Sequence, residues 1–238
     1  NLITNGDIIK ERRSLGNGRD MIVYDNSVTP MATYLFFLGV GTYDTFKKEF
    51  EYPDGHTFDL ELLVPPGSDP AIAQRSLDVL YDSIMWIYLF TGPEQYEQLG
   101  ERKKIMDLVK QRDLLKDESK GSSDQLKEIR EELKRAVGSI QTGYKYTGTA
   151  YREIGMQNSN FGGMENVGNT TISTNRIMPF PHMTDNAFEY LMRVKVHEFY
   201  HNLNGSEVTG RSPFEIWLNE AVTVHIERMY HAYHFGEE

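Results

Sequence analysis

Two histidines and a glutamate stand at a spacing that can hold a metal ion and use it. The sequence predicts a helix over residues 185–201. On that helix His197 and His201 are one turn apart, so their imidazoles lie on one face and can share one ion. Glu198 lies about 100° further around the helix, within reach of a water molecule on that ion. A histidine pair at this spacing also arises by chance as an ordinary surface pair, so a third ligand is needed.

A second helix supplies a candidate for the third ligand. Residues 212–215 form a capping box with proline at the first helical position, which predicts a helix that runs through residue 227. Glu220 lies two turns into this helix among apolar neighbours, where a carboxylate is costly unless it is paired or coordinated. A catalytic zinc generally has three protein ligands and one position open for water. We therefore expect Glu220 to complete a zinc site with the two histidines.

Several residues near this site have more than one interpretation. Glu227 lies seven residues after Glu220 on the same helix face, where it is either an acceptor for the free N–H of a ligating histidine or a solvated residue. The rival ligands are His225, His231 and His234. The first is displaced by five residues from Glu220 and the other two lie near the chain end, so we expect all three to be ordinary residues.

A glycine-rich segment upstream of the histidines has features of a substrate-binding strand. Gly162 and Gly163 let a backbone approach a ligand closely, and residues 167–173 after them read as a strand. The segment could therefore form a sheet edge that pairs with an extended peptide. A plain glycine turn before a strand is the alternative that these residues alone leave open.

The two motifs together resemble one family. Residues 197–201, the eighteen residues that follow and then Glu220 resemble the HExxH-x18-E zinc site of the aminopeptidase-N-like gluzincins, which include the leukotriene-hydrolysing aminopeptidases. Residues 160–168 resemble the Gly-Ala-Met-Glu-Asn exopeptidase motif of that family, in the expected order along the chain. The resemblance identifies the chain as a member of this zinc metallopeptidase family.

The resemblance implies roles for individual residues. The implied cofactor is zinc, and Glu198 is the implied general base. The implied substrate is a peptide with a free N-terminus, and Glu165 binds the α-amino group of that peptide. Phe161, just before the motif, is a candidate wall of the pocket for the first side chain. The substrate-binding residues that we expect from the motif are Gly162, Gly163, Met164, Glu165, Asn166 and Phe161.

The sequence departs from the family pattern at several points. Gly163 replaces the commoner alanine, and residues 221–222 differ from the glycine and the aromatic or other residue that usually follow the glutamate ligand. The family also stabilises the oxyanion with a tyrosine well downstream of the zinc site, and no residue here matches that tyrosine. The helical C-terminal region of the family is absent from this sequence as well. We therefore expect a missing C-terminal region of the same protein as a partner, and the chain looks like a fragment.

The elements that must position these residues indicate an α+β fold. Residues 1–52 resemble the last strands of an N-terminal β-sandwich domain, with a well-buried strand predicted over residues 31–40. The polar sequence at 51–55 suggests a domain boundary, and the period-two pattern at 58–62 predicts that a new sheet begins there. By resemblance, residues 53–238 are the first half of a thermolysin-like catalytic domain.

Two helical regions are predicted between the first strands of this domain and the glycine-rich segment. Apolar positions at three- and four-residue steps predict an amphipathic helix over residues 70–90. Residues 101–135 include 20 charged residues, with a break at residues 121–124 in the middle. We interpret them as a solvated antiparallel helical hairpin, with a disordered linker as the alternative, inserted at about residues 94–142.

Composition excludes other kinds of protein. Acidic residues outnumber basic ones by 35 to 25, a net charge of −10, which argues against nucleic acid as a partner. With no cysteine, disulfides, thiolate metal sites and cysteine nucleophiles are excluded, and no stretch is long and apolar enough to predict a membrane span. The compartment is unknown, although the lack of cysteine and of a leader favours the cytoplasm.

The sequence therefore predicts a zinc-dependent aminopeptidase that uses metal-activated water. The alternative from another class is a non-catalytic module, either a zinc-bound folding unit or a scaffold, and the fragment itself is possibly inactive. An endopeptidase is the enzymatic rival, which the amine-binding Glu165 argues against. Side-chain preference, epoxide hydrolysis, oligomeric state and the role of the charged insertion are left open.

Overall fold

The chain folds around a five-stranded mixed sheet. A computed structural model describes residues 1–27, 31–117, 123–157, 159 and 162–236. β5 and β6 form an antiparallel hairpin, β6, β7 and β9 run parallel, and β8 is antiparallel to β9. The order across the sheet is β5 (Asp44–Glu51), β6 (Thr57–Val64), β7 (Ala150–Met156), β9 (Asn169–Ser173) and β8 (Gly163–Met164).

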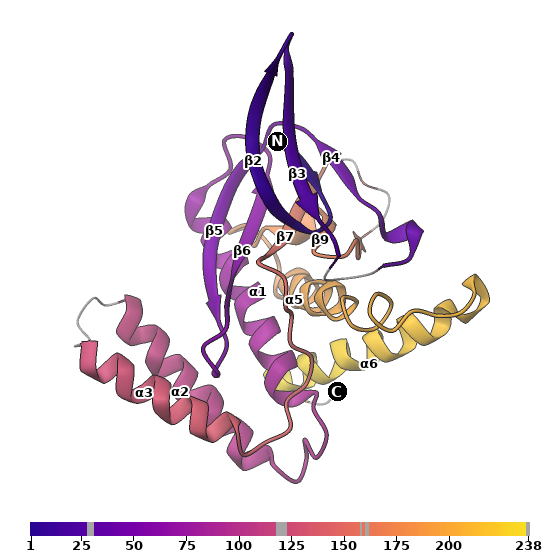
Figure 1. Ribbon diagram of the computed structural model, residues 1–238. Helices are drawn as coiled ribbons and strands as arrows, with labels where there is room; N and C mark the ends of the chain where they lie inside the picture. The colour runs from indigo at the N-terminus through magenta and orange to yellow at the C-terminus, as the bar shows by residue number, and fades with distance from the viewer. Residues whose placement is uncertain (28–30, 118–122, 158, 160–161, 237–238) are drawn as a thin grey trace.

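Helices lie along one face of this sheet (Figure 1). α1 packs against β5, β6 and α5, and α5 packs in turn against α6. α2 and α3 pack against each other as a hairpin to one side, and α4 is a single turn that follows β9 directly. The helices are α1 (Pro70–Phe90), α2 (Leu99–Asp117), α3 (Ser123–Val137), α4 (Thr174–Ile177), α5 (Asp185–Tyr200) and α6 (Ile216–Phe235).

Strand β6, the second strand of the sheet, contributes side chains to two cores. Leu60 and Leu62 belong to the main core with α1, whereas Leu63 belongs to a second, small core with Ile3 and Ile154. Successive side chains of a strand point to opposite faces, so this division follows from the period-two pattern of the sequence. The prediction of a strand over residues 58–62 is confirmed.

The N-terminal segment covers the second face of the sheet. Ile3 packs there, and the β2–β3 hairpin projects away from the body of the molecule (Figure 1). The β character predicted for this part of the chain is confirmed. The elements are β1 (Leu2–Thr4), which pairs with β4 (Leu38–Val40), β2 (Asp7–Gly16), which pairs with β3 (Arg19–Asp25), and the 3-10 helix η1 (Thr33–Leu35).

The predicted buried strand over residues 31–40 is wrong. Only the last three residues are a strand, and Tyr34, Phe36 and Leu38 are exposed. Residues 28–30, just before it, lie outside the described residues. An aromatic-rich segment needs a neighbouring strand to pair with, and β1 offers only three residues. The chain instead turns at η1, where the Leu35 carbonyl accepts hydrogen bonds from the Asn5 and Asn166 amides at 3.3 and 3.2 Å.

The prediction that a new sheet begins after residue 55 is also wrong. β5 pairs with β6 along its whole length, from Asp44 opposite Val64 to Glu51 opposite Thr57. The polar sequence between them is a hairpin turn closed by hydrogen bonds between Tyr52 and His56 and between Tyr52 and Gly55. A tight turn and a domain boundary share the same residue types, so composition does not distinguish them.

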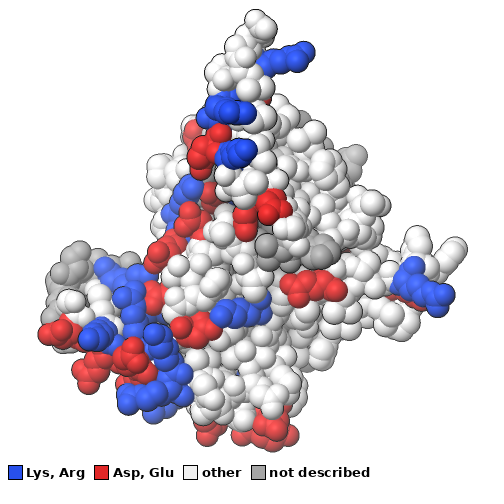
Figure 2. All heavy atoms as spheres, viewed as in Figure 1, with Lys and Arg blue, Asp and Glu red and all other residues white. Residues whose placement is uncertain are grey.

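The predicted helix over residues 70–90 is confirmed with the same bounds. The charged hairpin is also helical. Residues 121–122 of its predicted break lie outside the described residues, whereas Ser123 and Asp124, the other two residues of that break, begin α3. Acidic and basic side chains mingle over the hairpin (Figure 2). It is not simply solvated, because Arg102 and Arg112 are fully buried. The Arg102 guanidinium donates to the carbonyls of Pro93 and Gln141 at 2.7 and 2.9 Å, and so ties the two ends of the hairpin together.

A buried carboxylate anchors the hairpin to the sheet. Glu51, at the end of β5, accepts hydrogen bonds from Arg130 of α3 at 2.7 and 2.8 Å and from Lys116 of α2 at 3.1 Å. Burial opposes ionisation of this carboxyl, but the hydrogen bonds and charges of Arg130, Arg112 and Lys116 outweigh it and lower the Glu51 pKa to about 2. The hairpin is therefore held by ion pairs at a defined point on the sheet edge.

The chain leaves α1 and returns from the hairpin at the same place. The Gly143 N–H donates to the Tyr88 carbonyl at 2.7 Å. A side chain on Gly92 would collide with the backbone at Gln141, and one on Gly143 would collide with Thr91. Only glycine permits this approach.

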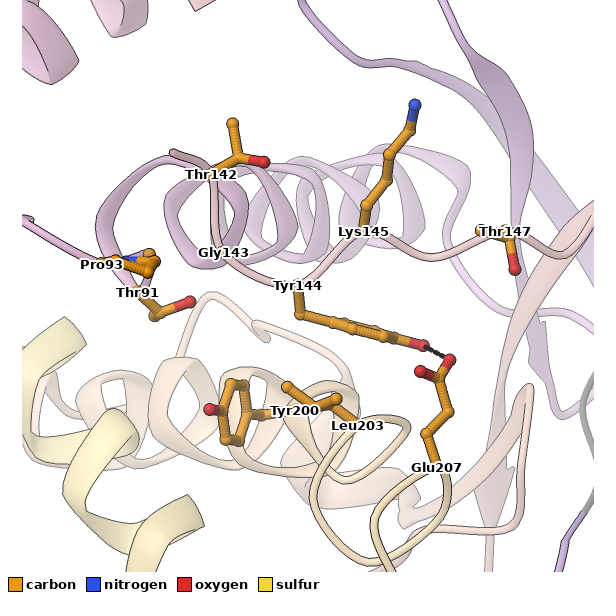
Figure 3. A pocket seen from close by; sticks show the side chains of 11 residues that line it. Thr91, Pro93, Thr142, Gly143, Tyr144, Lys145, Thr147, Tyr200, Leu203 and Glu207 are labelled. Carbon is orange, nitrogen blue, oxygen red and sulfur yellow. Dashed lines mark hydrogen bonds between the residues drawn. The ribbon is translucent and has the colours of Figure 1, made fainter. Parts of the chain in front are cut away.

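A cavity of about 750 Å³ adjoins this crossing (Figure 3). Tyr144 and Tyr200 point into it from opposite sides, and the Tyr144 hydroxyl donates to Glu207 at 3.1 Å. The described residues that line the cavity include none of the metal-ligand candidates. It is therefore separate from the histidine pair.

The architecture is α+β, as predicted from the sequence. Within the described residues, no helix combines the length and apolar character needed to cross a membrane.

Candidate metal centre and its neighbouring sheet edge

Two helices bring the candidate ligands together. The Thr184 hydroxyl caps α5 by accepting from the Ala187 N–H at 3.3 Å. The predicted capping box at the start of the second helix is present, with Glu215 accepting from the Ser212 N–H at 3.1 Å. Its first turn is a 3-10 helix, η2 (Pro213–Glu215), before α6 begins. Because α5 packs against α6, residues far apart in sequence meet between them.

His197, His201 and Glu220 converge in space. The two histidine Nε2 atoms are 3.1 Å apart. The Glu220 carboxylate oxygens lie 3.4 Å from the Nε2 of His197 and 3.7 Å from the Nε2 of His201. Within the part of the chain that the structure describes, this is the one group of three such side chains whose ligand atoms all lie within 4.8 Å of one another.

Hydrogen bonds at the other ring nitrogens orient both imidazoles. The Nδ1 of His201 lies 2.8 Å from the Asn204 carbonyl, and the Nδ1 of His197 lies 3.0 Å from a Glu227 oxygen. These oxygens accept hydrogen bonds, so each Nδ1 carries the proton and each Nε2 presents a lone pair. Two lone pairs that face each other are favourable only when a proton or a metal ion lies between them.

The donor set fits zinc. Two imidazole nitrogens and one carboxylate oxygen are ligands that zinc accepts in tetrahedral sites with one open position. A hydrogen bond from the far ring nitrogen to a carboxylate or carbonyl is the usual support of a zinc-binding histidine. Both histidines here have such a partner.

Burial and charge act differently on the two histidines. Burial lowers the pKa of His201. For His197 burial also acts downward, but the hydrogen bond to Glu227 and the charges of the nearby carboxylates outweigh it and raise the pKa. The carboxylates around His197 therefore favour positive charge at this cluster, which a cation between the two Nε2 atoms would supply.

The surroundings of Glu220 differ from the sequence-based expectation. Its side chain is 46% exposed, because the first turns of α6 are themselves exposed at Ile216, Trp217 and Leu218. The argument that coordination must offset the cost of a buried carboxylate therefore does not apply. Geometry alone places Glu220 beside the histidines.

Glu198 lies between α5 and the edge strand β8. It is buried, and its Oε2 has no hydrogen-bond partner among the described residues. Burial, reinforced by the charges of Glu165 and Glu220, raises the Glu198 pKa to about 8. A side chain at Gly163 would collide with the Glu198 carboxylate, so the glycine leaves room for this carboxylate against the strand.

The glycine-rich motif forms the edge of the sheet. β8 pairs with β9 on one side only, with Gly163 opposite Ile172. The Gly162 carbonyl accepts from the Ser173 N–H at 3.1 Å. Backbone groups alternate in direction along a strand, so the N–H and C=O of Gly163 point away from β9 toward the open edge.

The other motif residues have distinct environments. Glu165 and Met164 are half-buried, and Asn166 is buried and donates to the Leu35 carbonyl at 3.2 Å. Phe161 lies outside the described residues. Asn166 thus connects the motif to the N-terminal segment.

Glu227 is buried rather than solvated. One of its oxygens faces His197 and the other accepts from the Nε of Arg193 at 2.6 Å. The rival histidines lie elsewhere, since His231 contacts Glu189 at 3.0 Å, His234 contacts Asp82 at 3.0 Å and His225 is exposed.

Sequence reasoning missed three residues that border the site. Arg193 lies one turn before His197 on the same face of α5, and it donates to Glu227 of α6. Asn204 orients His201 and also donates to the Asn219 carbonyl at 2.6 Å. Tyr34 lines a pocket together with Asn219, and partial burial, together with the charges of Glu165 and Glu220, raises the pKa of Tyr34. No local pattern signals Tyr34, because it is distant in sequence.

Comparison with known proteins places this geometry in a family. The chain is 24% identical over 224 residues to aminopeptidase N of Caulobacter vibrioides, a match that covers 94% of this chain and 20% of the relative. The fold is similar to the crystal structure of Legionella pneumophila aminopeptidase A in complex with aspartic acid, with a TM-score of 0.70, 19% identity, and coverage of 99% of this chain and 21% of that one. The chain thus spans about a fifth of the length of these relatives. The model of the peptidase family M1 domain matches residues 109–238, which is more than half of the chain. The chain therefore belongs to peptidase family M1.

Proposed function

We propose that this chain carries the metal-binding and amine-binding parts of a zinc-dependent aminopeptidase. The observation that carries the proposal is the convergence of the His197 and His201 lone pairs with the Glu220 carboxylate, beside a buried Glu198 that lies against an open sheet edge. Membership of a peptidase family supports hydrolysis of peptide bonds as the reaction.

In the proposed mechanism, each residue has one task. His197, His201 and Glu220 would hold zinc, which when bound supplies a Lewis acid that polarises the scissile carbonyl and acidifies a water molecule. Glu198 takes the proton of the attacking water and later delivers it to the leaving amine.

The sheet edge and its flanking residues position the substrate. The outward N–H and C=O of Gly163 hold the peptide backbone in an extended conformation. Glu165 pairs with the α-ammonium of the first residue, which fixes the bond to be cut at one residue from the N-terminus. Glu227 keeps the His197 ring in the tautomer that leaves Nε2 free.

We also propose a division of the chain into an N-terminal β part and a thermolysin-like catalytic part. Since β5 belongs to the main sheet, the proposed division lies near residue 43 rather than residue 52. The tyrosine that stabilises the oxyanion in the family has no match here, and we propose that a further segment of the protein supplies it.

Zinc content tests the metal centre. The purified chain is expected to contain one zinc per molecule by elemental analysis, and Glu220→Ala is expected to lose most of it because only two ligands remain. His225→Ala, which removes an exposed histidine from the same helix, is the control and should keep the zinc. Equal zinc in Glu220→Ala and the unmodified chain would contradict the ligand assignment.

N-acetylation of the substrate tests the amine site. Peptides with a free N-terminus should be cleaved and their acetylated counterparts should not, because acetylation removes the charge that pairs with Glu165. Glu165→Gln is expected to lower kcat/KM on free peptides roughly 30- to 100-fold. Cleavage of acetylated and free peptides at similar rates would support an endopeptidase instead. Zinc binding without cleavage of either would support the non-catalytic alternative for this chain.

A further inference from the structure

An arginine lies beside the upstream end of the edge strand. A side-chain carbon added to Gly162 would be 2.7 Å from the Nη1 of Arg176, so the guanidinium lies directly against this glycine. Arg176 also stacks on the ring of Tyr190 at 4.9 Å and donates to its hydroxyl at 3.2 Å. These contacts hold the guanidinium plane at one position.

The charge of Arg176 is free to bind a ligand. Within the described residues, no carboxylate lies within 4.0 Å of its guanidinium, in contrast to Arg152 and Arg193, which pair with glutamates at 2.7 and 2.6 Å. Its contact with Tyr190 lies at the exposed surface. An unpaired, oriented guanidinium is well suited to a carboxylate, since its fork of N–H groups matches two carboxylate oxygens.

The direction of a bound peptide follows from the proposed function, on which this inference rests. The first residue of the substrate lies at Glu165, and the bond to be cut must lie near Glu198, which contacts Gly163. An extended peptide therefore runs antiparallel to β8, from Glu165 past Gly163 to Gly162. The cut bond joins the first and second residues and lies beside Gly163, so the third residue lies one step of about 3.3 Å further along, beside Gly162 and Arg176.

We propose that Arg176 binds a carboxylate at the third residue of the substrate. This carboxylate is either the C-terminus of a tripeptide or the side chain of Asp or Glu at that position. Arg176 thus lies on the leaving-group side of the cut bond and selects substrates without contacting the reacting atoms.

Matched peptides distinguish the two carboxylate sources. The zinc-loaded protein is assayed on Ala-Ala-Ala, on Ala-Ala-Ala-amide and on Ala-Ala-Asp-amide. Each carboxylate peptide is expected to have about tenfold higher kcat/KM than the neutral amide, through a lower KM. Arg176→Gln should abolish the preference with little change in kcat on the amide, and Arg176→Lys should keep part of it. Arg19→Gln, which changes an exposed arginine on the β2–β3 hairpin, is the control.

Binding to a Glu198→Gln background separates this inference from the proposed function. The same three peptides are titrated by calorimetry, and the carboxylate peptides should bind about tenfold more tightly, with the difference lost when Arg176→Gln is added. Equal affinity for all three peptides, or a preference that survives Arg176→Gln, would overturn the role of Arg176. If the full-length protein cleaves none of the peptides, the proposed function fails, and the binding preference alone then decides the inference.

Discussion

Replacing Glu198 with Gln in the full-length protein is expected to lower kcat by about a thousandfold or more, while the zinc content stays at one per chain. A general base contributes roughly 10²- to 10⁴-fold to a hydrolysis, and an amide of the same size cannot accept the proton. Glu198 follows His197 on α5 and is not one of the three proposed ligands, His197, His201 and Glu220. The Oε2 of Glu198 has no hydrogen-bond partner among the described residues, so the substitution breaks no contact at that oxygen.

The measurement pairs kcat on an aminoacyl p-nitroanilide with elemental analysis of the same sample. Glu189→Gln is the matched control, because Glu189 is a carboxylate on the same helix whose partner is His231 rather than the metal-ligand cluster. The control should retain the kcat and the zinc content of the unmodified protein. A Glu198→Gln variant that retains more than about a tenth of the rate would contradict the assignment of the base.

Replacing Glu153 with Ala is expected to destabilise the chain by roughly 3–5 kcal/mol, because it leaves a buried charge without its partner. Glu153 of β7 and Lys195 of α5 form an ion pair in which both side chains are 0% exposed. Burial raises the pKa of Glu153 and lowers that of Lys195, while each partner opposes this change in the other. The free energy of unfolding in urea measures the loss.

The double variant Glu153→Met/Lys195→Met separates the pair from its packing. Two apolar side chains of similar volume should restore most of the stability lost in Glu153→Ala, since a buried ion pair contributes little beyond its apolar replacement. Glu153→Ala, in which Lys195 has lost its partner, would then be less stable than the double variant. If Glu153→Ala cost less than about 1 kcal/mol, Lys195 would have to find another acceptor or lose its proton.

Local patterns predicted helices well. The bounds of α1 followed from apolar spacing and from the glycine after the helix. The structure adds the N-cap Asp69, whose side chain accepts from the N–H of Ala71 at 2.8 Å. The capping box before α6 likewise gave the start of the element that bears Glu220. Each of these signals lies within a few residues of the structure it determines.

Structure that depends on distant partners was not predictable in the same way. The aromatic residues 31–40 have strand composition, but the length of β1 decides how much of the segment can pair. Glu153 and Lys195 are 42 residues apart, and no periodicity connects them. The buried Arg102 reads as one more charge in a charged helix, because its acceptor carbonyls belong to other segments.

The exposed start of α6 shows the same limit at the site itself. The number of residues between the histidines and Glu220 matched the family motif, and in the structure Glu220 lies beside both histidines. The loop between α5 and α6, with its bridge between Asn204 and Val208, sets that geometry. The sequence of that loop contains no local pattern that predicts the position of Glu220 relative to the histidines.

Because Gly92 and Gly143 are in contact, the chain leaves the main fold for the charged hairpin and returns from it at the same point. Because the chain exits and re-enters at one point, residues 93–142 can grow or shrink over evolution without shifting the alignment of β6 with β7. Topology would even allow a direct splice from one glycine to the other. The obstacle is the interior, since Ile105, Val109 and Leu133 of the hairpin belong to the main core. A protein that lacks the hairpin would therefore need polar side chains on the surface of α1 and β5 that the hairpin now buries, or another segment to bury that surface.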